Sequence, residues 1–139
     1  MTFVKELTVD AVVNNIEVVT DFVNEELDKH DCLMKARMQI DVAIDELFGN
    51  IAHYAYDNGT GSATVRVEVT EEPLAVILTF IDSGKPFNPL ERPEPDTTLS
   101  AQERAIGGLG IFLVKKTMDE VVYRYEDGHN ILLIKKMLR

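Results

Sequence analysis

The chain of 139 residues has the length of one ordinary domain, and 45% apolar against 27% charged residues favours a globular core over bulk disorder. Its formal net charge of −10 argues against direct binding to nucleic acid or to an anionic membrane, because both require basic patches. The single cysteine, Cys32, cannot form an internal disulfide and no signal peptide is visible, so we expect one domain in a reducing, cytoplasmic environment.

The first part of the chain predicts a strand followed by two helices. Alternating apolar residues indicate a short strand over 3–9, and Asp10 is a plausible N-cap of the helix that follows. Apolar residues recur at helical spacing over 11–27 and again over 33–56. Cys32 lies just before this second helix, where a thiol can be activated or can simply be a small polar residue at the helix entrance. The core stripe expected for the second helix consists of Ala36, Ile40, Ala43, Leu47, Ile51 and Tyr54.

The middle of the chain predicts a hairpin and a long loop. An alternating apolar run over 63–70 and a more apolar run over 74–81 are separated by a short turn, so we expect an antiparallel hairpin. Residues 85–106 then contain four prolines, many charges and few core residues. Because loops of this length in a compact domain are usually functional or mobile, we expect this segment to serve function rather than the core.

The last part of the chain predicts a helix over 109–118 and a final hairpin with strands at 119–125 and 130–136. Because most strands are joined by hairpins, we expect a mixed but mostly antiparallel sheet. The three helices must then cover one face of it. The expected fold class is therefore α/β (α+β), a two-layer sandwich in a single domain of residues 1–139.

Glu46 and Asn50 are the first candidate site residues. They are four residues apart on the second predicted helix, so their side chains share one face beside the core stripe. A glutamate can accept a proton from an attacking hydroxyl or water, and an asparagine oxygen can join a Mg²⁺ shell that already holds phosphates. The pair alone is also typical of a solvated helix face.

A second candidate follows the strand predicted over 74–81. An acid at a strand end, here Asp82, can point its carboxylate into a pocket and accept a hydrogen bond from an exocyclic amine such as that of adenine. Gly84 allows the backbone to approach a flat ring closely. The same residue types also form plain turns. The run reads Asp82-Ser83-Gly84-Lys85-Pro86-Phe87.

The third candidate is the glycine-rich run Gly107-Gly108-Leu109-Gly110, directly before the last predicted helix. Glycines at a helix start expose backbone N–H groups, and these bind phosphate together with the positive end of the helix dipole. The run lacks the context of a dinucleotide fingerprint and the ending of a Walker A loop. A glycine hinge beside the long loop is the alternative.

In this order and at these separations, the three segments resemble the N, G1 and G2 boxes of the GHKL ATPase superfamily, which has the Bergerat fold. Within it they are most similar to the bacterial anti-sigma-factor serine kinases, and the resemblance covers nearly the whole chain. The residues that carry it are Glu46-Leu47-x-x-Asn50 with Tyr54-Ala55-Tyr56, Asp82-x-Gly84-x-Pro86-Phe87-x-Pro89, and Gly108-Leu109-Gly110-Ile111-x-Leu113-Val114 with Met118-Asp119-Glu120.

The resemblance implies a site for ATP and Mg²⁺ between the helices and a lid formed by residues 85–106. Glu46 would be the general base on the attacking hydroxyl, and Asn50 would be the Mg²⁺ ligand. Asp82 would bind the adenine amine, with Gly84 beside the ring. Arg104 could contact the γ-phosphate, although its spacing departs from the family pattern. His53 could help to shape the phosphate side, or it could be a buried helix histidine. The other residues implied in nucleotide binding are Pro86, Phe87, Gly107, Gly108, Leu109, Gly110 and Ile111.

The function implied by the resemblance is an anti-sigma regulatory factor with protein-serine/threonine kinase activity. It would transfer the γ-phosphoryl group of Mg-ATP to a serine of a small antagonist protein, bind a sigma factor, and act as a homodimer. The alternative is a non-catalytic module that uses ATP only to order its lid and choose partners. Glu46 favours the enzyme.

Overall fold

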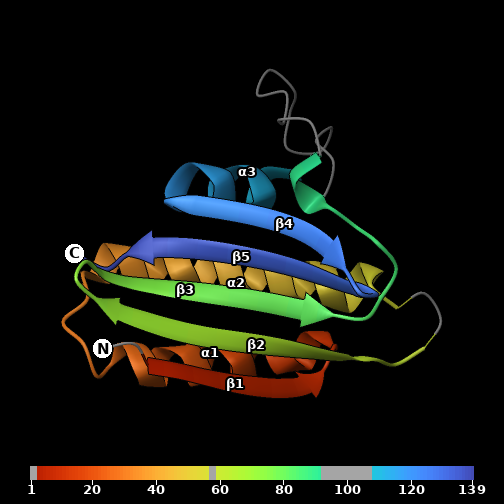
Figure 1. The fold of residues 1–139 in the computed structure, drawn as a ribbon, viewed down its shortest axis with the longest axis horizontal. Helices are drawn as coiled ribbons and strands as arrows, with labels where there is room; N and C mark the ends of the chain where they lie inside the picture. The colour runs from red at the N-terminus through yellow and green to blue at the C-terminus, as the bar shows by residue number, and fades with distance from the viewer. Residues whose placement is uncertain (1–2, 57–58, 92–107) are drawn as a thin grey trace.

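The computed structural model describes residues 3–56, 59–91 and 108–139, which form one five-stranded sheet and three α-helices (Figure 1). The strand order across the sheet is β1-β2-β3-β5-β4, and every neighbouring pair is antiparallel. The elements are β1 (Phe3–Asp10), a 3-10 turn η1 (Val13–Asn15), α1 (Ile16–Leu27), α2 (Met34–Tyr54), β2 (Ser62–Glu71), β3 (Leu74–Asp82), a 3-10 turn η2 (Pro89–Glu91), α3 (Gly108–Thr117), β4 (Glu120–Glu126) and β5 (His129–Met137).

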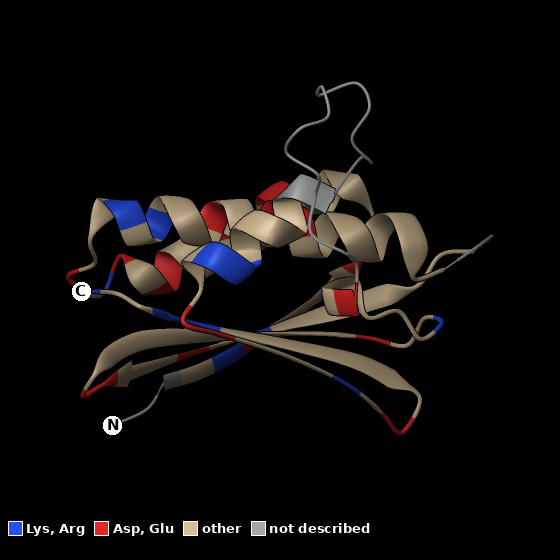
Figure 2. Ribbon diagram, turned by 90° about the horizontal axis from the view of Figure 1, so that it is seen from above, with Lys and Arg blue, Asp and Glu red and all other residues tan. Residues whose placement is uncertain are grey.

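The sheet and the helices form two layers. All three described helices lie on the same face of the sheet, as Figure 2 shows from above. One apolar core joins the layers, and Phe48 of α2 and Phe80 of β3 are among its largest fully buried side chains. Burying one such side chain stabilises the fold by roughly 1.5–3 kcal/mol. The expected two-layer α+β sandwich is confirmed, with a sheet that is antiparallel throughout its described strands rather than mixed.

Both predicted hairpins are present, as β2 pairs with β3 and β4 pairs with β5. In β2, buried and half-buried residues alternate because only one face meets the helices. β3 is buried along most of its length because it is the central strand, between β2 and β5. The apolar character that distinguishes the run over 74–81 in the sequence therefore reflects its central place in the sheet.

The buried face of α2 agrees with the predicted stripe only in the first part of the helix. Ile51 is half-buried and Tyr54 is exposed, so the prediction that Tyr54 belongs to the core is wrong. Near its end the helix buries Asn50 and Ala55 instead. This last turn contacts the loop that follows β3, because the Lys85 N–H donates a hydrogen bond to the Ala55 carbonyl. Tyr54 then lies outside, with its ring centroid 5.5 Å from that of Phe87.

The first helix begins later than predicted. Asp10 is the last residue of β1 and not a helix N-cap, because its register with Ser62 extends the sheet by one pair. The chain then passes through η1, and the N-cap of α1 is Asn15, whose side chain instead donates a hydrogen bond to the Asp10 carbonyl at 2.8 Å. Asp10 therefore pairs within the sheet and does not cap the helix.

Three segments far apart in the sequence meet at one end of the sheet: the end of α2, the end of β3 and the start of β5 (Figure 1). The start of α3 contacts α2 at Glu46. The antiparallel pairing of β3 with β5 sets Asp82 opposite Asn130. Within the described ranges, no helix is long and apolar enough to cross a membrane.

Candidate functional site

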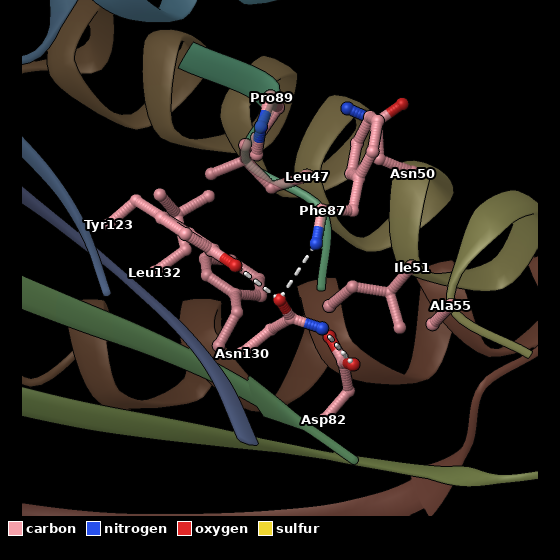
Figure 3. Close-up of a pocket in the computed structure, with 11 residues that line it drawn as sticks. Leu47, Asn50, Ile51, Ala55, Asp82, Phe87, Pro89, Tyr123, Asn130 and Leu132 are labelled. Carbon is pink, nitrogen blue, oxygen red and sulfur yellow. Dashed lines mark hydrogen bonds between the residues drawn. The ribbon is translucent and has the colours of Figure 1, made fainter. Parts of the chain in front are cut away.

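A small pocket lies between the end of α2 and the ends of β3 and β5. Its walls include Asn50 from the helix and Asp82 from the sheet, which the sequence analysis assigned to separate segments. The cavity volume open to the centre of a water molecule is about 30 Å³, more than the roughly 10–15 Å³ that one water needs by this measure. The other lining residues are Leu47, Ile51, Ala55, Phe80, Phe87, Pro89, Tyr123, Asn130 and Leu132 (Figure 3).

Asp82 is the buried acid of this pocket. It is the last residue of β3, and only 5% of its surface is exposed. Its Oδ1 accepts two hydrogen bonds, from the Gly84 N–H at 2.9 Å and from Asn130 Nδ2 at 2.9 Å. These two donors hold the carboxylate against the turn that follows the strand, so the side chain is fixed before any ligand binds.

Asn130 is a residue of this site that the sequence analysis did not single out. It lies at the start of β5, is 6% exposed, and its amide contacts four groups, of which Figure 3 draws Asp82, Phe87 and Tyr123. Nδ2 donates to Asp82 Oδ1 and, at 2.8 Å, to the Lys85 carbonyl. Oδ1 accepts from the Phe87 N–H at 3.0 Å and from the Tyr123 hydroxyl. The signal that could have found it is register, since antiparallel pairing of the strands predicted at 74–81 and 130–136 brings their ends together.

Gly84 makes a close approach within the protein itself. A Cβ atom at this position would lie 2.2 Å from the Ala55 carbonyl oxygen and 2.6 Å from the Ala55 Cβ. Glycine is therefore required here by the contact with the end of α2. This contact brings the strand end and the helix end together and so forms the base of the pocket.

Glu46 lies on the seam between α2 and α3. It is half-buried, and a Cβ atom on Gly110 would be only 2.1 Å from Glu46 Oε2. The glycine at the start of α3 is thus what allows this helix to approach the carboxylate. The structure brings the first and third candidate segments together at this contact, while Asn50, one turn further along α2, joins them to the pocket.

The amide of Asn50 is a buried polar group whose nitrogen makes no hydrogen bond within the described residues. Asn50 is 9% exposed, and among the described residues its Nδ2 is buried with no hydrogen-bond partner. Buried polar groups are normally hydrogen-bonded, so an amide in this state is suited to a polar ligand. An asparagine amide offers an oxygen to a cation or an N–H₂ group to an anion, depending on its rotation about χ2.

The described residues contain no cluster of three or more His, Cys, Asp or Glu side chains that could hold a metal ion. This donor set does not suit a metal ion held by protein groups alone. It does fit Mg²⁺, which keeps waters and takes few protein oxygens when it also binds phosphates. Asn50, with Glu46 one turn away, is the group that could supply such an oxygen.

The remaining predicted site residues lie in several different surroundings. Phe87 lines the pocket, whereas Pro86 is exposed and Ile111 is a core residue at 2% exposure. His53 is exposed on α2, so the expectation of a buried helix histidine is wrong. In this part of the helix the buried polar residue is Asn50. Gly108 and Leu109 form the first turn of α3. Arg104, Gly107 and the predicted lid beyond Glu91 lie outside the described residues.

Burial perturbs two titratable groups near these elements. Desolvation raises the pKa of the Tyr123 phenol, so the hydroxyl keeps its proton and remains a donor to Asn130. Burial also raises the pKa of the Cys32 thiol, whose Sγ donates to the Leu27 carbonyl at 3.5 Å. A raised pKa disfavours the thiolate, and this favours the reading of Cys32 as a small residue at a helix entrance over an activated thiol.

Known proteins resemble this chain in sequence. Residues 9–136 match the family described as the histidine kinase-like ATPase domain. The serine-protein kinase RsbW of Bacillus licheniformis is 29% identical over 106 residues, covering 70% of this chain and 63% of that protein. RsbW of Bacillus pumilus is 31% identical over 105 residues, covering 70% and 64%. RsbW of Listeria monocytogenes is 29% identical over 99 residues, covering 68% and 62%, so the match spans less than two thirds of each relative's length.

The fold also has a solved counterpart. The crystal structure of the RsbU and RsbW domains of Rv1364c from Mycobacterium tuberculosis superposes with a TM-score of 0.69 at 16% sequence identity, covering 98% of this chain and 32% of that one. At this identity the likeness is one of fold. Since the family match extends over nearly the whole chain and the strands and helices agree with it, this chain belongs to the histidine kinase-like ATPase domain family.

Proposed function

We propose that this chain is an ATP-binding anti-sigma regulatory factor that transfers the γ-phosphoryl group of Mg-ATP to a serine of a small antagonist protein. The observation that carries the proposal is the contact of Gly110 with the Glu46 carboxylate, one helical turn from the pocket that contains Asn50 and Asp82. A glycine-rich helix start and a carboxylate thus meet one helical turn from a residue of the pocket that contains the buried acid. Similarity to proteins named serine-protein kinase RsbW supports the assignment.

Glu46 would act as the general base. Its carboxylate would accept the proton of the serine hydroxyl while the serine oxygen forms its bond to the γ-phosphorus and the bond to the β-phosphate oxygen breaks. Phosphoryl transfer depends mainly on positioning and charge stabilisation, and Glu46 is placed on a rigid helix and half-buried beside α3. The proton therefore has an acceptor close to the proposed phosphate position.

The two ends of the nucleotide would be bound by different elements. Asp82 would accept a hydrogen bond from the exocyclic amine of adenine, since its carboxylate is buried in the pocket and already oriented. The first turn of α3 would donate backbone N–H groups to phosphate oxygens, aided by the positive end of its dipole. Asn50 lies between these elements and would hold Mg²⁺ through its amide oxygen. When bound, the ion would neutralise phosphate charge.

One wall of the pocket is formed by residues that lie outside the sheet. This wall is the segment of Phe87 and Pro89, which follows β3. It is also the start of the lid predicted over residues 85–106. We therefore assign to this segment the task of covering the bound nucleotide.

A direct experiment tests the kinase. The chain is incubated with Mg-ATP and the small antagonist protein encoded nearest to it, and the antagonist is then weighed by intact mass spectrometry. One added phosphate on a serine is the expected result. No added phosphate at saturating ATP would refute the kinase and leave the non-catalytic regulator. A sigma factor and a second copy of the chain are the other proposed partners, and size measurement of the mixtures tests both.

A further inference from the structure

The Asn130 side chain makes four hydrogen bonds but belongs to none of the three sequence segments that predict nucleotide binding. We propose that Asn130 is a positioning residue that fixes the Asp82 carboxylate as a hydrogen-bond acceptor and thereby sets a preference for adenine over guanine. This inference rests on the proposed nucleotide function. It is carried by the four hydrogen bonds of the Asn130 amide, which is 6% exposed and faces Asp82 across the β3–β5 pair (Figure 3).

The surroundings of Asn130 permit only one orientation of its amide. On one side are two acceptors, Asp82 Oδ1 and the Lys85 carbonyl, and on the other are two donors, the Phe87 N–H and the Tyr123 hydroxyl. A side-chain amide has two N–H donors and two oxygen lone pairs, so all four are used. Rotation by 180° would place the amide oxygen against two acceptors and the N–H₂ group against the Phe87 N–H, which can only donate. The N–H₂ group therefore always faces Asp82.

This fixed orientation determines what Asp82 can offer to a ligand. Among the described residues, both hydrogen bonds to the carboxylate end on Oδ1, from Gly84 and Asn130, which leaves Oδ2 as the acceptor for a ligand. Adenine presents an amine donor at its C6 position, whereas guanine presents a carbonyl oxygen there. Two acceptors facing each other in a buried pocket are unfavourable, so a locked Asp82 favours adenine.

Asn130 also holds the wall of the pocket. Its bonds to the Lys85 carbonyl and the Phe87 N–H attach the loop after β3 to the start of β5. The same side chain thus positions both the acid and the loop that forms one wall of the pocket.

The test measures nucleotide preference in the full chain by isothermal titration calorimetry with ADP and with GDP, both with Mg²⁺. Since only folded protein binds, the ratio of the two dissociation constants does not change when a variant is partly unfolded. Asn130→Ala should reduce the preference for ADP about tenfold, the scale of one buried hydrogen bond to a charged group. Tyr123→Phe, which removes one donor to Asn130 Oδ1, should reduce it about threefold.

Asn88→Ala is the matched control. The Asn88 side chain accepts a hydrogen bond from the Leu90 N–H in the same loop at 2.9 Å and is not bonded to Asp82. Its loss perturbs the loop alone, so the preference for ADP should stay within about twofold of the unchanged chain. A fall equal to that of Asn130→Ala would show that any loosening of the loop is sufficient, and would overturn the proposal.

A double-mutant cycle separates positioning from direct contact. In an Asp82→Ala chain, adding Asn130→Ala should change the ADP-to-GDP ratio by no more than about twofold, because the residue acts through Asp82. A further tenfold fall would show that Asn130 contacts the base itself. An unchanged ratio in Asn130→Ala, or in Tyr123→Phe if the first variant does not fold, would also overturn the inference. An unchanged chain that binds neither nucleotide would refute the proposed function as well.

Discussion

The two ends of the candidate site are built in different ways. At the end formed by the sheet, Asp82, Asn130 and the loop after β3 form a buried network in which the Asn130 amide uses all its hydrogen-bonding groups. At the end formed by the helices, Glu46 and Asn50 lie on α2 beside the start of α3, and the Asn50 amide nitrogen has no partner among the described residues. The Asn130 amide is thus fully paired without a ligand, while the Asn50 amide has a donor to offer to one.

This difference matches the demands of the two parts of a nucleotide. A base is recognised by a few fixed donors and acceptors, which a sheet can hold in register. Phosphates and a cation carry charge that must be met and released in each cycle, and the unpartnered amide nitrogen of Asn50 beside the start of α3 suits that purpose. We therefore expect substitutions at the sheet end to alter stability and base preference, and substitutions at the helix end to alter phosphoryl transfer.

Glu46→Gln should produce the largest effect and should affect only the helix end. The amide cannot accept the serine proton, so phosphoryl transfer should fall by about 10²–10⁴, while ATP binding is retained. Intact mass of the antagonist gives the rate, and calorimetry with ATP gives the affinity. Transfer at the original rate would show that Glu46 is not the base.

Gly110→Ala should lower transfer by about a hundredfold with little change in stability. The new Cβ would lie 2.1 Å from Glu46 Oε2, and the flexible end of that side chain can swing aside and leave its position. Alanine is also the better helix former by about 1 kcal/mol. Gly49→Ala is the control, since a Cβ there meets only Ile16 Cδ1 at 3.9 Å. A large fall in the thermal midpoint would contradict the explanation.

Gly84→Ala should act on the sheet end through stability. Its Cβ would lie 2.2 Å from the Ala55 carbonyl oxygen, a backbone atom that cannot swing away. We expect a loss of about 2–3 kcal/mol in the free energy of unfolding, measured by urea denaturation. Gly59→Ala serves as the control because nothing lies within 4 Å of its Cβ position. If Gly84→Ala were as stable as Gly59→Ala, the close contact between β3 and α2 would be wrong.

Asn50→Ala should distinguish the metal from the nucleotide. Loss of the amide should weaken Mg-ATP about tenfold more than metal-free ATP. The free energy of unfolding should change little, by about 1 kcal/mol, because the Nδ2 atom that is removed has no described partner. Equal weakening of both ligands would remove Asn50 from the proposed metal site.

A pH titration of stability should detect a contribution from outside both ends. The ammonium groups of Lys5 and Lys29, 2.6 and 2.9 Å from Glu26 Oε1, hold the pKa of this buried carboxyl below its usual range. The stabilisation is fully present above the unfolded pKa of about 4.3 and is lost as the pH falls through the lower folded pKa. It should amount to about 1 kcal/mol, since both lysines are half exposed.

Glu26→Gln should remove this dependence. The chain with glutamine should show a flatter loss of unfolding free energy in acid than the unchanged chain, measured by urea denaturation at several pH values below 5. Base preference and phosphoryl transfer should not change, because Glu26 lies on α1, away from the site. Identical acid profiles of the two chains would show that the ion pairs contribute nothing.

Much of the fold was predictable because its patterns are local. Helical spacing placed Glu46 and Asn50 on one face of α2, and alternation predicted both hairpins within one or two residues. The errors occurred where elements meet. Asp10 is the last residue of a strand because it pairs with Ser62. His53 and Tyr54 lie outside the core at the end of α2, where Ala55 instead contacts the loop after β3.

The sequence by itself determined the order of the elements, the polarity of each face and the residue types at both ends of the site, since these depend on neighbours within one or two turns of chain. Only the tertiary structure decided which of these residues meet. The Asn130 hydrogen bond to Asp82 joins residues 48 positions apart, and the contact of Gly110 with Glu46 joins two helices separated by two strands. Strand register and helix packing create such contacts, and no local pattern encodes them.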